Sequence, residues 1–139
     1  MRLLKTYLLL APSLVIVGCK PQEVVEAPEM MLVNEVVQKT INDNGKELKV
    51  KVGQEISLSL PENRTTGYQW QLSSGELLSV TSDVYVAEVD AGQVGTGGMR
   101  EYLLVAETEG QGQLSAKYVR PWEKDVAPEQ KFEMKVIVE

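Results

Sequence analysis

The chain has 139 residues, a length typical of one domain, with 43% hydrophobic and 24% charged residues. Its formal net charge of −6 disfavours binding to nucleic acid, and its one cysteine excludes an internal disulfide. The absence of histidine excludes Ser-His-Asp and Cys-His catalysis and the usual zinc sites. We therefore expect a binding protein rather than an enzyme, with no metal and no cofactor.

Residues 1–18 are predicted to be a signal peptide of the lipoprotein type. Arg2 and Lys5 precede the apolar run Tyr7–Val17, which suits a secretion signal and is too short to cross a bilayer. A glycine then precedes Cys19, as in a bacterial lipobox. The alternative is an ordinary signal peptide with an incidental cysteine.

Acylation of Cys19 is expected to anchor the mature chain to the membrane of a bacterial cell envelope. Residues 19–30 include two prolines and three glutamates without a regular period, and they are predicted to be a tether. Lys20 stands where an aspartate often marks retention in the inner membrane of enteric bacteria. We therefore expect the outer membrane, with the domain facing the periplasm or the cell surface.

Residues 31–139 show the period-two alternation of β-strands and no convincing helical period. Asn44-Gly45 is a strong hairpin signal between Ile41 and the first alternating segment. The strand-like segments are 48–52, 56–60, 68–72, 84–89, 101–106, 114–118 and 132–138. Seven or eight short strands predict an all-β fold, a two-sheet antiparallel sandwich, with a small barrel or a jelly roll as alternatives.

The segment Pro61–Tyr68 links two predicted strands and combines stiff with permissive residues. Thr65 and Thr66 are β-branched and therefore stiff at χ1. Gly67 permits the positive φ of a sharp turn before the next strand begins. We expect a rigid turn that projects its backbone, and a plain connecting turn is the alternative.

Two later loops also have unusual compositions. Asp90–Met99 contains four glycines, which let another backbone approach closely but would also suit a flexible connection. Arg120-Pro121-Trp122 precedes the charged run 123–125, so we expect Trp122 to be exposed rather than folded onto the edge of the sandwich. Exposed Trp and Arg are the residue types that dominate interface energetics.

Together the three segments resemble motifs of the chagasin family of cysteine protease inhibitors, over roughly residues 45–138. That family carries an Asn-Pro-Thr-Thr-Gly-aromatic motif, a Gly-x-Gly-Gly motif and an Arg-Pro-Trp motif, in this order. The matching residues are Asn63, Arg64, Thr65, Thr66, Gly67 and Tyr68, then Gly95, Thr96, Gly97 and Gly98, then Arg120, Pro121 and Trp122. Trp70 follows the first motif at close range and is expected in the core.

The resemblance implies an immunoglobulin-like sandwich that inhibits papain-like cysteine proteases reversibly and tightly, by wedging three loops into the active-site cleft. We expect the protein to be a monomer, and the target protease is left open. Arg64 stands where the family usually has proline, which bears on loop rigidity and protease preference. The alternatives are a cell-surface module that binds a carbohydrate or another ligand, and a structural envelope lipoprotein.

Overall fold

The computed structural model describes residues 18, 35–88 and 96–139. The predicted signal peptide apart from Gly18, the tether with Cys19, and Gly95 of the second motif lie outside the described residues. The domain boundaries at residues 18 and 30 therefore stay predictions. In the described part of the chain, no helix is long and apolar enough to span a membrane.

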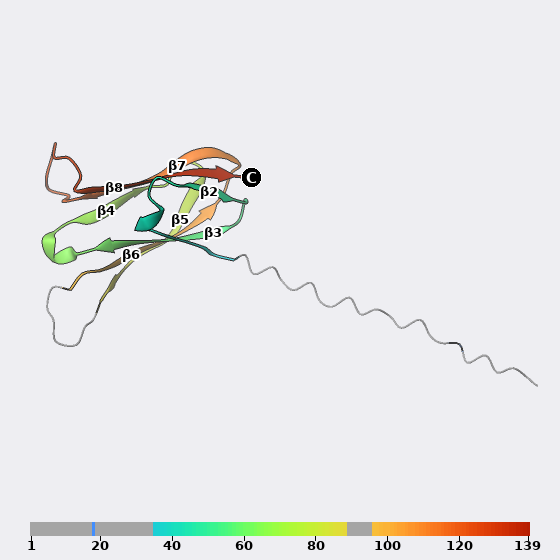
Figure 1. The fold of residues 1–139 in the computed structure, drawn as a ribbon, viewed down its shortest axis with the longest axis horizontal. Helices are drawn as coiled ribbons and strands as arrows, with labels where there is room; N and C mark the ends of the chain where they lie inside the picture. Colours follow the sequence, from blue (N-terminus) through green and yellow to red (C-terminus); the bar gives the residue numbers. More distant parts are fainter. Residues whose placement is uncertain (1–17, 19–34, 89–95) are drawn as a thin grey trace, which may run out of the picture. The chain divides into compact units, whose positions relative to one another are not determined.

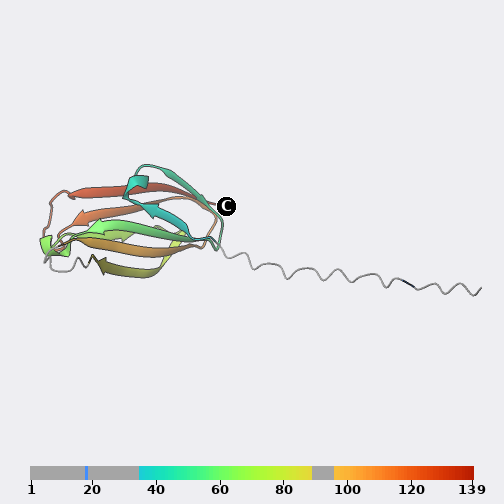
Figure 2. The same cartoon turned by 60° about the horizontal axis from the view of Figure 1, so that its bottom comes forward.

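The described residues form eight β-strands and two 3-10 turns. In chain order these are β1 (Val37–Thr40), η1 (Ile41–Asp43), β2 (Glu47–Val50), β3 (Glu55–Glu62), η2 (Arg64–Thr66), β4 (Gln69–Ser73), β5 (Leu78–Ala87), β6 (Gly98–Ala106), β7 (Gly110–Val119) and β8 (Gln130–Val138). The strands make two four-stranded sheets, in the orders β1-β3-β6-β5 and β2-β8-β7-β4 (Figures 1 and 2). The predicted all-β, two-sheet sandwich is confirmed.

The direction of two edge strands differs from the prediction. β1 runs parallel to β3, and β2 runs parallel to β8, whereas the other four pairings are antiparallel. Both sheets are therefore mixed, and the expectation of a wholly antiparallel sandwich was wrong for these two pairs. Because β1 and β2 lie in different sheets, each pairs with a strand that does not directly follow it in the chain, and such a pair need not be antiparallel.

The hairpin predicted at Asn44-Gly45 is wrong for the same reason. A turn does form there, with a φ of 78° at Gly45, but it is hydrogen-bonded to β8, and the strands on its two sides pair with β3 and β8 instead of with each other. The Asn44 side chain donates to the Lys131 carbonyl at 3.1 Å and accepts from the Glu133 amide at 2.8 Å. The Gly45 amide donates to the Glu133 carbonyl at 2.7 Å. The chain leaves this turn as β2, which pairs with β8.

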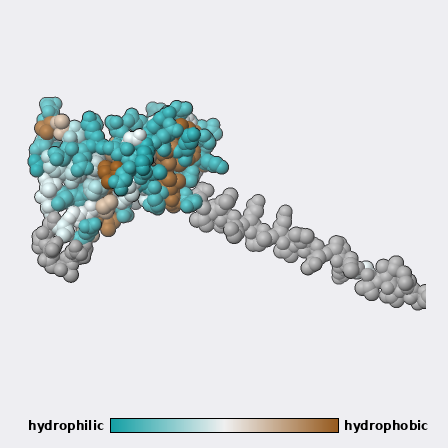
Figure 3. All heavy atoms as spheres, viewed as in Figure 1, coloured by the Kyte–Doolittle hydropathy of each residue, from teal (hydrophilic) through white to brown (hydrophobic). Residues whose placement is uncertain are grey.

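The core lies between the two sheets and is built by the alternation seen in the sequence. Its members are Leu48, Val50, Ile56, Leu58, Leu60, Trp70, Leu78, Tyr102, Leu104, Ala106, Leu114, Ala116, Tyr118, Phe132, Met134, Val136 and Val138. Full burial of a side chain such as Phe132 stabilises the fold by about 1.5–3 kcal/mol. Trp70 is 3% exposed, as predicted. The face shown in Figure 3 is mostly hydrophilic, with apolar residues in small separate areas.

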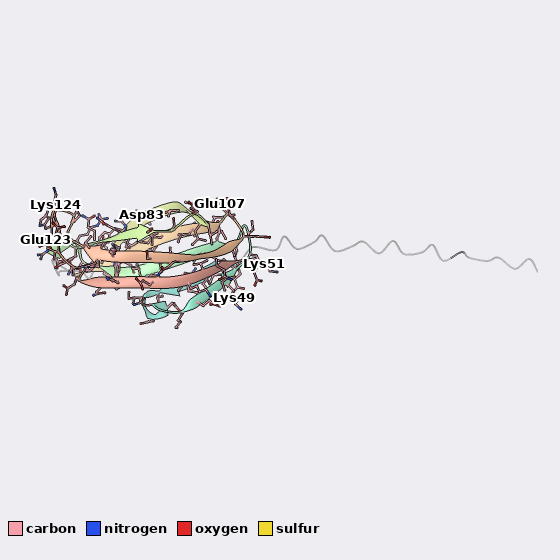
Figure 4. The ribbon with its side chains drawn as sticks, turned by 90° about the horizontal axis from the view of Figure 1, so that it is seen from above. Lys49, Lys51, Asp83, Glu107, Glu123 and Lys124 are labelled. Carbon is pink, nitrogen blue, oxygen red and sulfur yellow. The ribbon has the colours of Figure 1, made fainter. Side chains whose placement is uncertain are left out.

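The strand register brings the ends of three loops to one end of the sandwich. These are the β3–β4 loop (63–68), the β5–β6 loop (88–97) and the β7–β8 loop (120–129). The residues that flank them pair directly: Glu62 with Gly98, Ala87 with Gly98, Gln69 with Val119, and Tyr118 with Gln130. The β5–β6 loop connects strands of one sheet, and the β7–β8 loop connects strands of the other. The β3–β4 loop passes from the first sheet to the second and therefore has one end beside each of them. Figure 4 shows Glu123 and Lys124 at the end opposite Lys49 and Lys51.

Candidate functional site

The β3–β4 loop is a 3-10 turn whose own side chains hold its backbone. Asn63 caps the turn, because its Oδ1 accepts from the Thr65 amide at 3.1 Å and from the Thr65 hydroxyl at 2.6 Å. The Thr66 hydroxyl donates to the Asn63 carbonyl at 2.7 Å, and the Gly67 amide donates to the Arg64 carbonyl at 3.1 Å. The predicted turn is therefore present, and these hydrogen bonds support the expectation that it is rigid.

Gly67 ends this turn in a conformation that favours glycine. Its φ is 79°, in the left-handed region where a Cβ is costly. The indole of Trp122 lies directly against it: a Cβ at Gly67 would lie 2.9 Å from Cζ2 of that ring and closer still to Cη2. Trp122 is nevertheless 65% exposed. The prediction of an exposed tryptophan is confirmed, and its ring covers the turn rather than the edge of the core.

Arg120 makes the second link between the β7–β8 and β3–β4 loops. Its Nε donates to the Thr66 carbonyl at 3.1 Å, and its guanidinium lies 4.5 Å from the centroid of the Tyr68 ring. Its Nη1 is 3.2 Å from the Glu123 carboxylate within its own loop. Pro121, between Arg120 and Trp122, is exposed. The first and third predicted motifs thus form one structure.

The aromatic residues beneath the β3–β4 loop connect it to the core. The ring of Tyr118 lies 5.2 Å from that of Tyr68 and 4.9 Å from that of Trp70, measured between centroids. The Tyr118 hydroxyl accepts from the Asn63 amide at 2.9 Å. The Trp70 indole donates to the Pro61 carbonyl at 2.8 Å. Both ends of the loop therefore rest on buried side chains.

The described part of the β5–β6 loop lies beside the first loop. The Thr96 hydroxyl donates to the Glu88 carbonyl at 2.8 Å, and the Glu88 amide donates to the Gly97 carbonyl at 3.1 Å. A Cβ at Gly97 would lie 3.5 Å from the Glu62 carbonyl. At Gly98 a Cβ would lie 2.6 Å from the Tyr85 ring, so the chain's own packing requires glycine there. The expectation that the glycines let another backbone approach stays a prediction. Gly95 lies outside the described residues.

Glu62 is a site residue that lies outside the three sequence motifs. It is 2% exposed, and it occupies the inner-face position after Ile56, Leu58 and Leu60, where alternation calls for an apolar side chain. One oxygen accepts from the Trp70 amide at 3.0 Å. A charged residue at the end of an alternating apolar strand was the signal that could have identified it.

Basic residues compensate the buried charge of Glu62. Its other oxygen accepts from Nε of Arg64 at 3.2 Å and lies 3.7 Å from Nη1 of Arg100. The hydrogen bond to Asp83 raises the pKa of Arg100, so that guanidinium stays charged beside Glu62. Within the described ranges, no cluster of acidic or cysteine side chains could hold a metal ion.

The chain has clear relatives in sequence. Residues 49–136 match the family described as "Chagasin family peptidase inhibitor I42". Chagasin of Trypanosoma cruzi is 30% identical over 84 residues, which cover 57% of this chain and 76% of that protein. Amoebiasin-1 of Entamoeba histolytica is 34% identical over 101 residues, which cover 72% of this chain and 97% of that protein.

Solved structures share the fold. The cysteine protease inhibitor EhICP2 from Entamoeba histolytica matches with a TM-score of 0.70 and 26% identity, over 75% of this chain and 96% of that one. Amebosin matches with a TM-score of 0.63 and 30% identity, over 75% of this chain and 98% of that one. The resemblance based on three loop motifs is thus confirmed. The chain belongs to the chagasin family of peptidase inhibitors, which are not themselves enzymes.

Proposed function

We propose that this chain is a reversible inhibitor of papain-like cysteine proteases, and that its loops enter the active-site cleft as one unit. The observation that carries the proposal is the pair of links between two loops: Arg120 to the Thr66 carbonyl, and Trp122 on Gly67. Loops that are already ordered lose little conformational entropy on binding. Family membership supports this function over a carbohydrate-binding or purely structural role.

Each loop has its own place in the proposed complex. The tip Thr65–Gly67 would lie over the catalytic cysteine and histidine of the protease. The β5–β6 loop, with Thr96–Gly98, would run along one side of the cleft and bind through its backbone. Arg120 and Trp122 would pack on the other side, where a large exposed indole supplies the residue type most common at interface hot spots.

The shape of the β3–β4 loop supports inhibition without cleavage. A protease needs an extended strand that presents its carbonyl to the nucleophile. Here the Thr66 carbonyl accepts from Arg120, and the next residue, Gly67, has a positive φ. Apart from Cys19, the chain has no cysteine that could form a mixed disulfide with the protease. Inhibition is therefore expected to be competitive and non-covalent.

The test is to titrate active papain with the purified protein and measure residual activity, with trypsin as the control protease. We expect tight inhibition of papain that reverses on dilution, and no effect on trypsin. Mass spectrometry after prolonged incubation with excess papain should find the inhibitor intact. Stoichiometric cleavage at residues 64–67, or an adduct that survives denaturation, would contradict the proposed mechanism.

We also propose that Cys19 is lipidated and that the mature protein is a monomer anchored in a bacterial envelope, in the outer membrane. The support for lipidation is in the sequence alone: a positively charged start, the apolar run Tyr7–Val17, and Gly18 before Cys19. The preference for the outer membrane comes from Lys20. Palmitate labelling of the wild type and Cys19→Ser in a bacterial host tests the modification. Equal labelling of the two proteins would exclude it.

A further inference from the structure

Arg64 occupies the position where proline would restrict the backbone of the β3–β4 loop, yet the loop is ordered without proline. Building on the proposed function, we propose that Arg64 is a positioning residue that holds this loop against β5 through the buried carboxylate of Glu62 and the ring of Tyr85. Arg64 acts through these two residues on the inhibitory tip, which begins at the next position in the chain.

The first contact of Arg64 is a charge-assisted hydrogen bond to a carboxylate that cannot move. The Glu62 side chain has no exposed surface, and its second oxygen is held by the Trp70 amide at 3.0 Å. Nε of Arg64 donates to the first oxygen at 3.2 Å. Because a buried carboxylate requires compensating charge, it strongly favours the conformation in which Arg64 folds back over it.

The second contact covers one face of the guanidinium, whose edge donates to Glu62. Cζ of Arg64 lies 4.1 Å from the centroid of the Tyr85 ring, in the geometry of a cation–π interaction. Tyr85 is itself fixed, because its ring packs on Gly98, where a Cβ would lie 2.6 Å from it. A planar guanidinium can stack on a ring and donate to a carboxylate at once, which a lysine ammonium cannot do.

These contacts connect the first loop to the base of the second. Tyr85 is in β5 and Gly98 begins β6, so both strands that carry the β5–β6 loop lie under Arg64. The network continues from Glu62 to Arg100, which donates to Asp83 of β5 at 2.8 Å. Arg120 and Trp122 link the β3–β4 loop to the β7–β8 loop, and Arg64 links it to the strands at the base of the β5–β6 loop.

The experiment measures the inhibition constant for papain with Arg64→Ala, Tyr85→Ala and the double variant. Each single variant is expected to weaken inhibition by about tenfold, and the double variant by no more than about threefold beyond either one, because the two residues act as a unit. Arg64→Pro should recover most of the loss seen with Arg64→Ala. Melting temperatures should fall only slightly with the Arg64 variants, because the Trp70 amide and Arg100 still hold Glu62 and the Arg64 side chain is half exposed.

Two outcomes would overturn the inference. If Arg64→Pro were as weak as Arg64→Ala and the effects of Arg64 and Tyr85 simply multiplied, Arg64 would be contacting the protease directly. A protein that did not inhibit papain at all would refute the proposed function instead. Even in that case, amide hydrogen exchange of residues 63–67 in the free protein tests whether Arg64 positions the loop. Exchange should be slow in the wild type and in Arg64→Pro, and fast in Arg64→Ala. Equal exchange in all three would refute it.

Discussion

The contact between Gly67 and Trp122 allows a substitution that damages inhibition much more than folding. In Gly67→Ala, the new Cβ would overlap the indole, whose nearest atoms lie at 2.9 Å or less from it. The backbone cannot move easily, because the Gly67 amide donates to the Arg64 carbonyl at 3.1 Å. Trp122 is 65% exposed, so its ring can turn away into solvent at little cost to the fold.

The two costs differ in size. Placing an L-residue at a φ of 79° costs roughly 1–2 kcal/mol, and the smaller entropy of the unfolded alanine chain offsets about 0.4–1 kcal/mol of that. The expected loss of stability is therefore about 1 kcal/mol. Displacing a tryptophan anchor costs about 2 kcal/mol or more of binding free energy, which weakens inhibition about 30-fold.

The assay is the inhibition constant for papain beside the free energy of unfolding in urea. Gly45→Ala is the matched control, because Gly45 has nearly the same φ, 78°, with no atom within 4 Å of its missing Cβ. It should lose similar stability and inhibit normally. Gly67→Asn should lose less stability than Gly67→Ala, since asparagine tolerates positive φ, but should inhibit as poorly.

A double variant tests whether the tryptophan transmits the effect. Trp122→Ala alone should weaken inhibition about 30-fold with little change in melting temperature. If Gly67→Ala acts by displacing the indole, adding it to Trp122→Ala should change the inhibition constant by less than about threefold. Full multiplication of the two effects would refute this reasoning and show that the Gly67 backbone contacts the protease independently.

Three further predictions concern the supports of the loop. Arg120→Lys removes the donor to the Thr66 carbonyl and should raise the inhibition constant about tenfold; an unchanged constant would show that a point charge suffices. Tyr118→Phe leaves the Asn63 amide without its acceptor and should reduce the free energy of unfolding in urea by about 1–3 kcal/mol; an unchanged value would show that this hydrogen bond does not support the loop. Burial raises the pKa of Tyr102 to about 12, which disfavours its ionised form in the folded state. The free energy of unfolding in urea should therefore be steady up to about pH 10 and fall between pH 10 and 12. The fall should be smaller in Tyr102→Phe, which has no phenol to ionise at this position.

Much of the fold could be predicted from the sequence because burial on one face imposes a period of two. The run Ile56, Leu58 and Leu60 is completely buried, and Phe132 and Val136 follow the same rule in β8. This periodicity does not indicate whether an edge strand pairs in the parallel or the antiparallel direction. The turn at Asn44 and Gly45 has the composition of a hairpin, and only its hydrogen bonds to β8 show that the chain changes sheet there.

The candidate site, too, could be predicted only in part from the sequence. The motif residues could be predicted because rigid turns and exposed anchors require particular residue types, such as Gly67 at a positive φ and Trp122 on the surface. Tyr85, which supports Arg64, could not be predicted in this way, because it is an ordinary strand residue until the register places it beside Arg64.

Glu62 shows where the sequence nevertheless pointed to the site. Alternation along β3 is strictly apolar on the inner face until this last position, where a carboxylate replaces an aliphatic side chain at a considerable desolvation cost. A buried charge of this kind persists when the surrounding structure supplies donors, here the Trp70 amide, Arg64 and Arg100. Arg64 lies in the β3–β4 loop, and Arg100 lies in β6 near the base of the β5–β6 loop. The one inner-face position of β3 that is not apolar is thus the position that supports the loops proposed to bind the protease.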